Sequence, residues 1–337
     1  MLSRTADHLF WMARYMERAE NTARMLDVNY QASLLPQSAE EAVSGWKGLL
    51  GISELSGDFA TRHGAITLAN VMRYMVSDAE NGSSIRNCLQ AARENARAVR
   101  GTLTTEVWET QNQTWLEFQR LIANESFLRD PSTLFEWVKF RSHLSRGVTV
   151  GTMLQDESFH FLRIGSFLER ADNTARLLDV KFHAVESEYH GGGNGQSQSQ
   201  SQGNGQGQGQ GQGRDIEVDF YHWSGILRSV SGFEVYRKAY RNVIRPEKVA
   251  ELLILRPDMP RSMAACMHEV VINLQKVANE QSADTLRRAG RLQADLQYGR
   301  IDEILATGLH AYLTQFLERV NTLGVGISRD FLVPVAA

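Results

Sequence analysis

Two nearly identical stretches of charged residues carry most of the chemistry that this sequence offers. Residues 16–28 read MERAENTARMLDV and residues 168–180 read LERADNTARLLDV, so one Glu-Arg dipeptide begins at Glu17 and the other at Glu169. Carboxylates at helical spacing can hold an amine, act as an acid or base, or bind a hard cation, and neighbouring arginines can bind a carboxylate or phosphate. Each of these uses requires the acidic side chains to share one helix face.

A helical wheel at about 100° per residue places the charged residues of each stretch on one face. In the first copy, an apolar stripe continues without changing direction into four charged positions: Glu17, Glu20, Arg24 and Asp27. The second copy repeats the pattern at four equivalent positions: Glu169, Asp172, Arg176 and Asp179. We therefore predict that two charged inner faces meet near the middle of the molecule. Arg18 and Arg170 lie off these faces on the wheel, so we expect each to bind a neighbouring helix.

Carboxylates on a face that is directed into the core need partners, because burying an unpaired charge is costly. Glu20 and Arg24 are four residues apart, and Arg24 and Asp27 are three apart, so both pairs can form along the helix. The second copy repeats both spacings. Three acids against one arginine still leave each face short of two positive charges, which we expect another helix to supply.

A row of arginines farther along the chain is a candidate for that missing positive charge. The row lies beside an apolar stripe in the helix predicted after Ser84, at spacings of seven and four residues: Arg86, Arg93 and Arg97. The second copy has uncharged residues at these positions, so only one half of the chain carries the row. Such a row suits recognition of phosphate or carboxylate, although a basic row on a helix is often only a solvated face.

The repeat extends beyond the charged stretches. Glu169 follows Glu17 by 169 − 17 = 152 residues, and Ser262 follows the matching Ser84 by 262 − 84 = 178 residues. The offset between the repeats therefore grows by 178 − 152 = 26 residues. A low-complexity stretch of glycine and glutamine at 191–213 accounts for most of this increase, and it has no apolar residue that could pack in a core. We therefore predict an all-α protein made of two diverged helical-bundle repeats related by pseudo-twofold symmetry. The repeats would span 1–150 and 151–337, with a disordered linker at 187–215.

Helix signals agree with this fold class. The capping box at Ser38 predicts a helix that follows at once, and the Asp-Pro pair ending at Pro131 predicts another. The last helix is expected from about Ile301 onward, because apolar residues recur there every three or four positions. No run alternates with the period of two that a strand requires.

Several classes of protein are disfavoured by the sequence. A net charge of −3 gives no general attraction to nucleic acid, and no apolar run resembles a signal peptide or a membrane span. The two cysteines, Cys88 and Cys266, have no metal-ligand spacing and read as buried apolar residues. No nucleotide-binding loop is present, and no histidine follows either Glu-Arg motif at the spacing of a di-iron site. We expect a cytoplasmic protein with no metal, no cofactor and no nucleic-acid or membrane partner.

These motifs identify a resemblance. The opening 28 residues and the stretch SSIRNCLQAARENARAVRGTLTTEVWE closely resemble the bacterial alpha-E family, over most of the chain apart from the glycine/glutamine stretch. That family is a helical domain of unresolved activity with a Glu-Arg motif, which falls here on Glu17-Arg18 and Glu169-Arg170. Its genes typically sit beside a circularly permuted ATP-grasp ligase and a transglutaminase-like protein. The resemblance therefore implies a part in making or modifying a peptide or amide bond.

The expected function is that of a helical partner protein docking on an ATP-grasp ligase. The acids would order a site or hold an amine, and the arginine row would meet a carboxylate or phosphate. Two alternatives stay open. The chain could be a stand-alone enzyme on a peptide or aminoacyl substrate, with the motif carboxylates as general acid and base. It could also be a structural interaction module whose charged faces set the helix register.

Overall fold

A computed structural model describes residues 1–36, 38–191 and 223–332, without the side chains of 39, 41 and 180–191. All regular secondary structure within these ranges is helical, and none of it is strand. The predicted all-α class is therefore confirmed. None of the helices in the described ranges is long and apolar enough to span a lipid bilayer.

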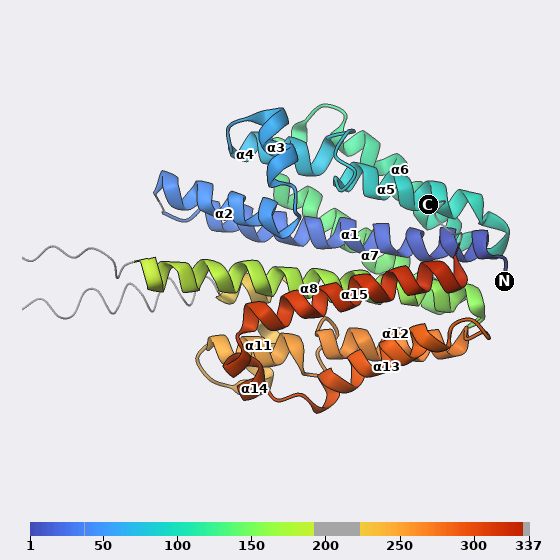
Figure 1. Ribbon diagram of the computed structural model, residues 1–337. Coiled ribbons are helices and arrows are strands. Elements are labelled where there is room, and N and C mark those ends of the chain that lie inside the picture. Colours follow the sequence, from blue (N-terminus) through green and yellow to red (C-terminus); the bar gives the residue numbers. More distant parts are fainter. Residues whose placement is uncertain (37, 192–222, 333–337) are drawn as a thin grey trace, which may run out of the picture.

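The helices fall into two series along the chain (Figure 1). The first series contains α1 (Ser3–Ser33), α2 (Ala39–Ile52), α3 (Ser56–His63), α4 (Leu68–Met72), a π-helical turn (Arg73–Ser77), α5 (Ile85–Ala98), α6 (Thr105–Ile122) and α7 (Pro131–Thr152). The second contains α8 (Glu157–Gly191), α10 (Phe233–Tyr240), α11 (Pro246–Ile254), α12 (Met263–Lys276), α13 (Ala283–Tyr298), α14 (Ile301–Thr307) and α15 (Leu309–Phe331). Short 3₁₀ turns precede α6 and α7, at Arg100–Thr102 and Ser126–Leu128.

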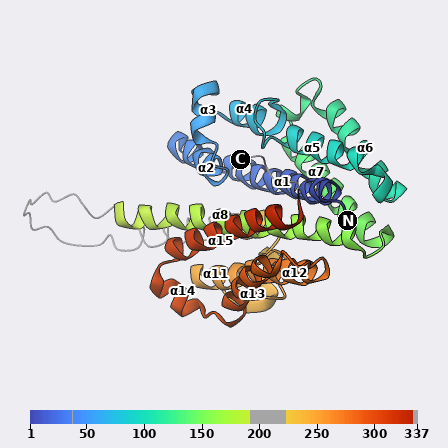
Figure 2. The ribbon, with the colours of Figure 1, turned by 45° about the vertical axis from the view of Figure 1, so that its right-hand side comes forward.

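The two longest helices, α1 and α8, lie side by side at the centre and run in the same direction (Figures 1 and 2). Their backbones approach closely at Gly165, where an added Cβ would lie 2.3 Å from the Phe10 carbonyl oxygen and 3.3 Å from the Ala13 Cβ. Only glycine fits there without moving a helix. The remaining helices pack outward from this central pair, the first series on one side and most of the second on the other.

The two series repeat one arrangement, in which α5, α6 and α7 accompany α1 and α12, α13 and α15 accompany α8. The first residues of α5 and α12 are 263 − 85 = 178 apart, and those of α7 and α15 are 309 − 131 = 178 apart. Tertiary contacts repeat as well: His8 Nδ1 lies 2.8 Å from Asn95 Oδ1, and His160 Nδ1 lies 2.8 Å from Asn273 Oδ1. Two parallel central helices with matching neighbours are what a twofold relation between repeats would produce.

Local sequence signals explain where several helices begin. The Ser84 and Ser262 hydroxyls each accept a hydrogen bond from a backbone N–H of the first turn and so cap α5 and α12. Helix α2 begins at Ala39, after the predicted cap, and α7 begins at Pro131, whose missing N–H is no loss at that position.

The prediction of one continuous final helix from Ile301 is wrong. Gly308 has φ +97°, a conformation that side chains disfavour, and it separates α14 from α15. The apolar period continues across this break, which is why the sequence pattern concealed it.

The predicted repeat boundary at 150/151 falls within the last turn of α7. The backbone of α8 continues to Gly191, beyond the predicted start of the linker at 187. The rest of the predicted linker, 192–215, lies outside the described residues.

Candidate functional site

The two Glu-Arg dipeptides bind each other across the α1–α8 interface. Arg170 donates from Nε to Glu17 Oε1 at 2.9 Å and from Nη2 to Oε2 at 2.8 Å. Arg18 donates in the same manner to Glu169, at 2.5 Å to Oε1 and 3.1 Å to Oε2. Each glutamate is thus held by a two-point ion pair from the other repeat, a geometry that guanidinium and carboxylate groups favour.

Arg18 and Arg170 bind a neighbouring helix as expected, but they do not lie apart from the charged faces. A helical wheel gives the direction of Cβ, whereas the guanidinium sits at the end of a long flexible stem that can wrap back toward the interface. The charged group also packs on an aromatic ring, since the Arg170 guanidinium carbon lies 4.9 Å from the Phe167 ring centroid.

Two arginines that the sequence analysis did not single out join Glu17 and Glu20. Arg261, in the loop before α12, donates to Glu17 Oε1 at 3.1 Å and also binds Glu20. Arg146 of α7 donates to Glu17 Oε2 at 3.1 Å and also binds Glu20. Arg24 pairs with Glu20 four residues away on α1, as predicted, at 2.8 Å.

The Glu17/Glu20 centre, defined by these two acids and their four arginine partners, therefore has a surplus of positive charge. Its members are Glu17, Glu20, Arg24, Arg146, Arg170 and Arg261. Four guanidinium groups against two carboxylates give 4 − 2 = +2. The positive charge that α1 itself lacks is thus supplied by other elements, as expected, but these are α7, α8 and the loop before α12 and not the helix after Ser84.

The acids of this centre are held in their charged form. Burial alone would raise the pKa of Glu17, but Arg170 and Arg261 outweigh burial and lower this pKa to about 2. Burial of Glu20 is likewise outweighed, by Arg261, Arg146 and Arg24, and its pKa lies well below the usual range. Both carboxylates are ionised at neutral pH and have no tendency to take up a proton there.

His143 of α7 lies at the edge of the centre between two donors. Its Nε2 is 3.2 Å from Arg24 Nη2, and its Nδ1 is 3.1 Å from Arg146 Nη2. Burial lowers the pKa of His143, and the nearby arginines lower it further against the opposing effect of Glu20. A neutral imidazole has one acceptor nitrogen, so it can satisfy only one of the two guanidinium donors. The surroundings of His143 thus hold more hydrogen-bond donors than acceptors.

The second motif forms a separate group on the same pair of helices. Glu169 accepts from Arg14 Nε at 2.7 Å as well as from Arg18, and Asp172 pairs with Arg176 at 2.8 Å, as predicted. Arg176 also binds Glu54 of the first repeat. This group balances its acids and arginines more evenly than the Glu17/Glu20 centre does.

Asp27 and Asp179 do not join either group. Asp27 accepts from Lys139 Nζ at 2.8 Å and from Ser132 Oγ at 3.1 Å, and Asp179 lies 2.7 Å from His310 Nδ1. Their partners are on α7 and α15, so the predicted pairs with an arginine three residues earlier do not form. The six motif carboxylates are therefore divided among several ion pairs along the interface.

The arginine row of α5 lies away from the motif faces. Arg93 donates to Asn112 Oδ1 of α6 at 3.1 Å, both Arg93 and Arg97 pair with Glu94, and Arg86 has no ion pair among the described residues. The hypothesis that this row neutralises the motif carboxylates is wrong. Only Arg97 of the row faces solvent, with 64% of its side chain exposed, whereas the Arg93 side chain is 22% exposed and Arg86 is partly buried.

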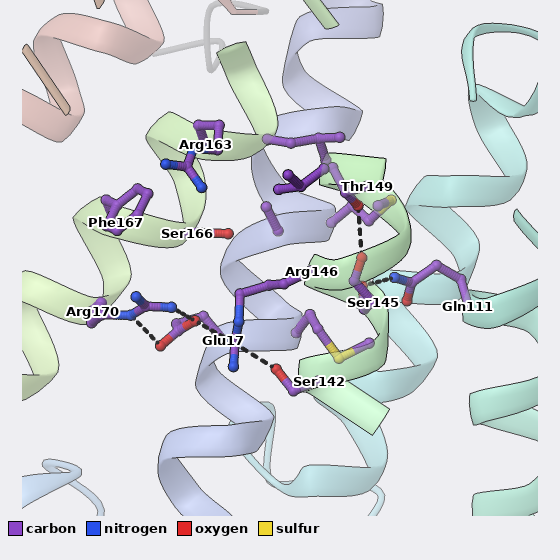
Figure 3. Close-up of a pocket in the computed structure, with 15 residues that line it drawn as sticks. Glu17, Gln111, Ser142, Ser145, Arg146, Thr149, Arg163, Ser166, Phe167 and Arg170 are labelled. Carbon is purple, nitrogen blue, oxygen red and sulfur yellow. Dashed lines mark hydrogen bonds and ion pairs between the residues drawn. The ribbon is translucent and has the colours of Figure 1, made fainter. Parts of the chain in front are cut away.

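A small cavity opens beside the Glu17/Glu20 centre, between α1, α7 and α8 (Figure 3). Its volume is about 50 Å³. Its charged lining residues are Glu17, Arg146, Arg163 and Arg170. The rest of the wall combines apolar side chains with hydroxyl groups: Met12, Ala13, Met16, Val150, Leu162 and Phe167 with Ser142, Ser145, Thr149 and Ser166. Gln111 lines it too, and its buried Oε1 accepts no hydrogen bond while its Nε2 donates to Ser145 at 2.6 Å.

Other reactive groups are poorly placed for chemistry. Cys88 and Cys266 are fully buried, and burial raises the pKa of each thiol to about 12. Within the part of the chain that the structure describes, no three His, Cys, Asp or Glu side chains are grouped to hold a metal ion. The Glu17/Glu20 centre and the cavity beside it are therefore the best candidates for a functional site.

The fold and site define a two-repeat helical protein built around buried, cross-paired Glu-Arg dipeptides. A family described as a predicted alpha-helical domain with a conserved ER motif, Alpha-E, matches residues 1–332, and the chain belongs to this family. Searches among curated proteins and among solved structures found no match. The motif for which the family is described thus forms, in this chain, the reciprocal ion pairs between α1 and α8.

Proposed function

We propose that this protein is a helical accessory partner of an ATP-grasp-type ligase in a system that forms or modifies amide or peptide bonds. The partner class comes from the family resemblance, which also implies a transglutaminase-like protein as a second candidate. The observation that carries the proposed role is the surplus of two positive charges at the Glu17/Glu20 centre. Such a centre suits binding of a carboxylate or phosphate group, the groups that an amide-forming ligase handles.

The state of the acids favours a binding role over stand-alone acid–base catalysis. A general base works best when its pKa lies near the working pH. Glu17 has a pKa of about 2 and is held by three arginines, so it is a weak base with little freedom to move. We infer that the motif acids position the arginines, and that the arginines meet the ligand.

The size of the cavity supports a ligand that is presented by another molecule. A cavity of about 50 Å³ is several times smaller than sites for whole small molecules, which measure roughly 300–1,000 Å³. This space accommodates a single carboxylate or chain end. Arg146 and Arg163, with side chains 28% and 27% exposed, are the arginines of the wall that an incoming group reaches first.

The charge surplus also separates this role from that of a purely structural module. A buried network that only fixes helix register is most stable when its charges balance, because each uncompensated charge carries a desolvation cost. Four arginines around two carboxylates retain such a cost, which an anionic ligand would remove. The row at Arg86, Arg93 and Arg97, which is exposed at Arg97, is a second, separate surface on which an acidic ligase surface would dock.

A pull-down from extracts of the native host tests this proposal. The tagged full-length protein is expected to recover an ATP-grasp ligase at moderate salt, identified by mass spectrometry. Arg93→Ala should weaken recovery, because it removes a charge from the docking row. Arg146→Gln should retain the ligase but lower the yield of its product, because it changes the cavity.

Arg129→Ala is the matched control, since Arg129 is an exposed arginine outside both surfaces. Absence of any ATP-grasp ligase from the wild-type sample would refute the partner assignment. Equal recovery and equal product yield for all three variants would refute the assignment of the two surfaces.

A further inference from the structure

The second repeat contains a copy of the Glu17/Glu20 centre that lacks counterparts of two of its arginines. The offset of 152 residues between α1 and α8 maps three acceptors of the first centre, Glu17, Glu20 and Asn21, onto Glu169, Asp172 and Asn173. In the first centre, Arg261 donates to all three, at 3.1 Å to Glu17 Oε1, at 2.9 Å to Asn21 Oδ1, and also to Glu20.

The residue equivalent to Arg261 is a serine. Arg261 comes directly before the capping residue of α12, and Ser83 comes directly before the capping residue of α5, with 261 − 83 = 178 as elsewhere in the repeat. The equivalent of Arg146 is Gly324, so neither of the long side chains that fill the first centre has a counterpart here.

A cavity of about 230 Å³ lies beside Ser83, the equivalent of Arg261. Its wall includes the three mapped acceptors and Ser83, together with arginines of both repeats: Arg14, Arg18, Ser83, Glu169, Asp172, Asn173 and Arg176. The cavity is therefore lined by a preformed set of oxygen acceptors, of the kind that surrounds Arg261 in the other repeat.

Two groups in this wall have hydrogen-bonding capacity that no described residue uses. Asp172 accepts from Arg176 through Oδ2, but its Oδ1 accepts no hydrogen bond from the described residues. Burial outweighs Arg176 and raises the pKa of Asp172, whereas the equivalent Glu20 is strongly stabilised as an anion. Asn21, which is only 3% exposed, also lines the cavity, and its buried Nδ2 donates to no acceptor.

The charge balance allows one more cation here. Three arginines, Arg14, Arg18 and Arg176, face the three acids Glu169, Asp172 and Glu54, which gives 3 − 3 = 0. An added guanidinium would bring the group to +1, which is less than the +2 of the Glu17/Glu20 centre. The first repeat thus shows that this architecture tolerates the additional positive charge.

We propose that this cavity, which we call the Asp172 cavity, binds a guanidinium group of an external ligand in the position that Arg261 occupies in the other repeat. The guanidinium would donate to Glu169, Asp172 and Asn173, and Asn21 Nδ2 would donate to an oxygen of the same ligand. The ligand class is arginine-like: a free arginine derivative or an arginine side chain in a peptide. The site shares Asn21 with the surroundings of Arg261 but none of the charged residues of the Glu17/Glu20 centre, and it does not depend on the proposed ligase partner.

Calorimetric titration of the full-length protein with methylguanidinium and with L-arginine tests the site. The wild-type protein is expected to bind both. Ser83→Arg should abolish binding, because the new side chain would take the position of the ligand. Asp172→Asn should weaken binding about tenfold or more, the typical effect of losing a charged hydrogen-bond partner.

Gly82→Arg is the matched control, because it adds the same charge one residue away, at an exposed position with open space around it. This variant should bind as the wild type does. The melting temperature of each variant shows whether it is folded, and Asp172→Asn provides the test if Ser83→Arg is unstable.

Failure of the wild type to bind either compound would overturn the proposal, as would unchanged binding by a folded Ser83→Arg variant. Binding of inorganic phosphate that strengthens in Asp172→Asn would also overturn it, because the cavity would then be an anion site. Tighter binding of an arginine residue with both ends blocked than of L-arginine would support the site and indicate a peptide side chain. The reverse order would support the site and indicate a free arginine derivative.

Discussion

Replacing Glu17 by glutamine isolates the role of charge in the central ion pairs. The substitution keeps the size of the side chain but removes the carboxylate that Arg170, Arg146 and Arg261 share. Three guanidinium groups then lose an anionic partner inside the protein. Removing one member of a buried ion pair typically costs about 3–5 kcal/mol of stability, because the other member stays buried without compensation.

The pKa of Glu17 gives an independent figure of similar size. A shift from 4.5 to about 2 is roughly 2.5 units, and at about 1.4 kcal/mol per unit the ionised carboxylate contributes about 3 kcal/mol. Because the folded-state pKa is lower than the unfolded one, this contribution is complete above about pH 4.5 and is lost as the pH falls toward 2. At pH 3 about half of it should remain.

Urea unfolding followed by circular dichroism at pH 7 and pH 3 measures both effects. Glu17→Gln should lower the unfolding free energy by about 3 kcal/mol at pH 7, and the gap to wild type should narrow by about half at pH 3. Glu136→Gln is the control, because this glutamate is 69% exposed in its pair with Lys139 and should matter by less than about 0.5 kcal/mol. A loss below about 1 kcal/mol at pH 7, or a gap that does not depend on pH, would refute the reasoning.

Two further predictions concern packing and reactivity. Gly165→Ala should lower the unfolding free energy by about 1–3 kcal/mol, because its Cβ would overlap the Phe10 carbonyl. Gly147→Ala is the control, because this position within α7 has open space around it, and it should be neutral or stabilise by up to about 1 kcal/mol. Thermal unfolding of both variants measures the difference. Equal effects of the two substitutions would contradict the close approach of α1 and α8. Cys88 and Cys266 should not react with a thiol reagent at pH 8 until the protein is unfolded in urea, and rapid labelling of the native protein would contradict their burial.

The sequence was sufficient for the features that are encoded locally. Ser84, Ser262 and Pro131 mark helix starts by interactions within one turn, and the helical class follows from periodicity along the chain. The pairs Glu20–Arg24 and Asp172–Arg176 follow from spacing alone. Gly308 was missed because the apolar pattern runs across it unchanged, and only the backbone angle reveals the break.

The composition of the site was much less accessible from the sequence. Arg146 and Arg261 reach the motif acids from elements more than 100 residues away, and no local pattern marks them. One signal was present in the sequence: Arg261 stands beside the cap of α12 where the first repeat has Ser83. Once the two repeats are aligned, an arginine in one that matches a serine in the other marks a position at which the two charged sites differ.

The reciprocal pairing of the Glu-Arg dipeptides has an evolutionary consequence. A chain with only one repeat would present a glutamate and an arginine that a second identical chain could pair in the same manner. Gene duplication and fusion of a self-associating ancestor would therefore preserve both reciprocal pairs, Glu17 with Arg170 and Glu169 with Arg18. A symmetric ancestor of that kind carries the same residue at both equivalent positions. Arg261 opposite Ser83, and Arg146 opposite Gly324, are differences that only a fused chain can hold. The fused gene could therefore fill one of two identical centres with its own arginines and leave the other open.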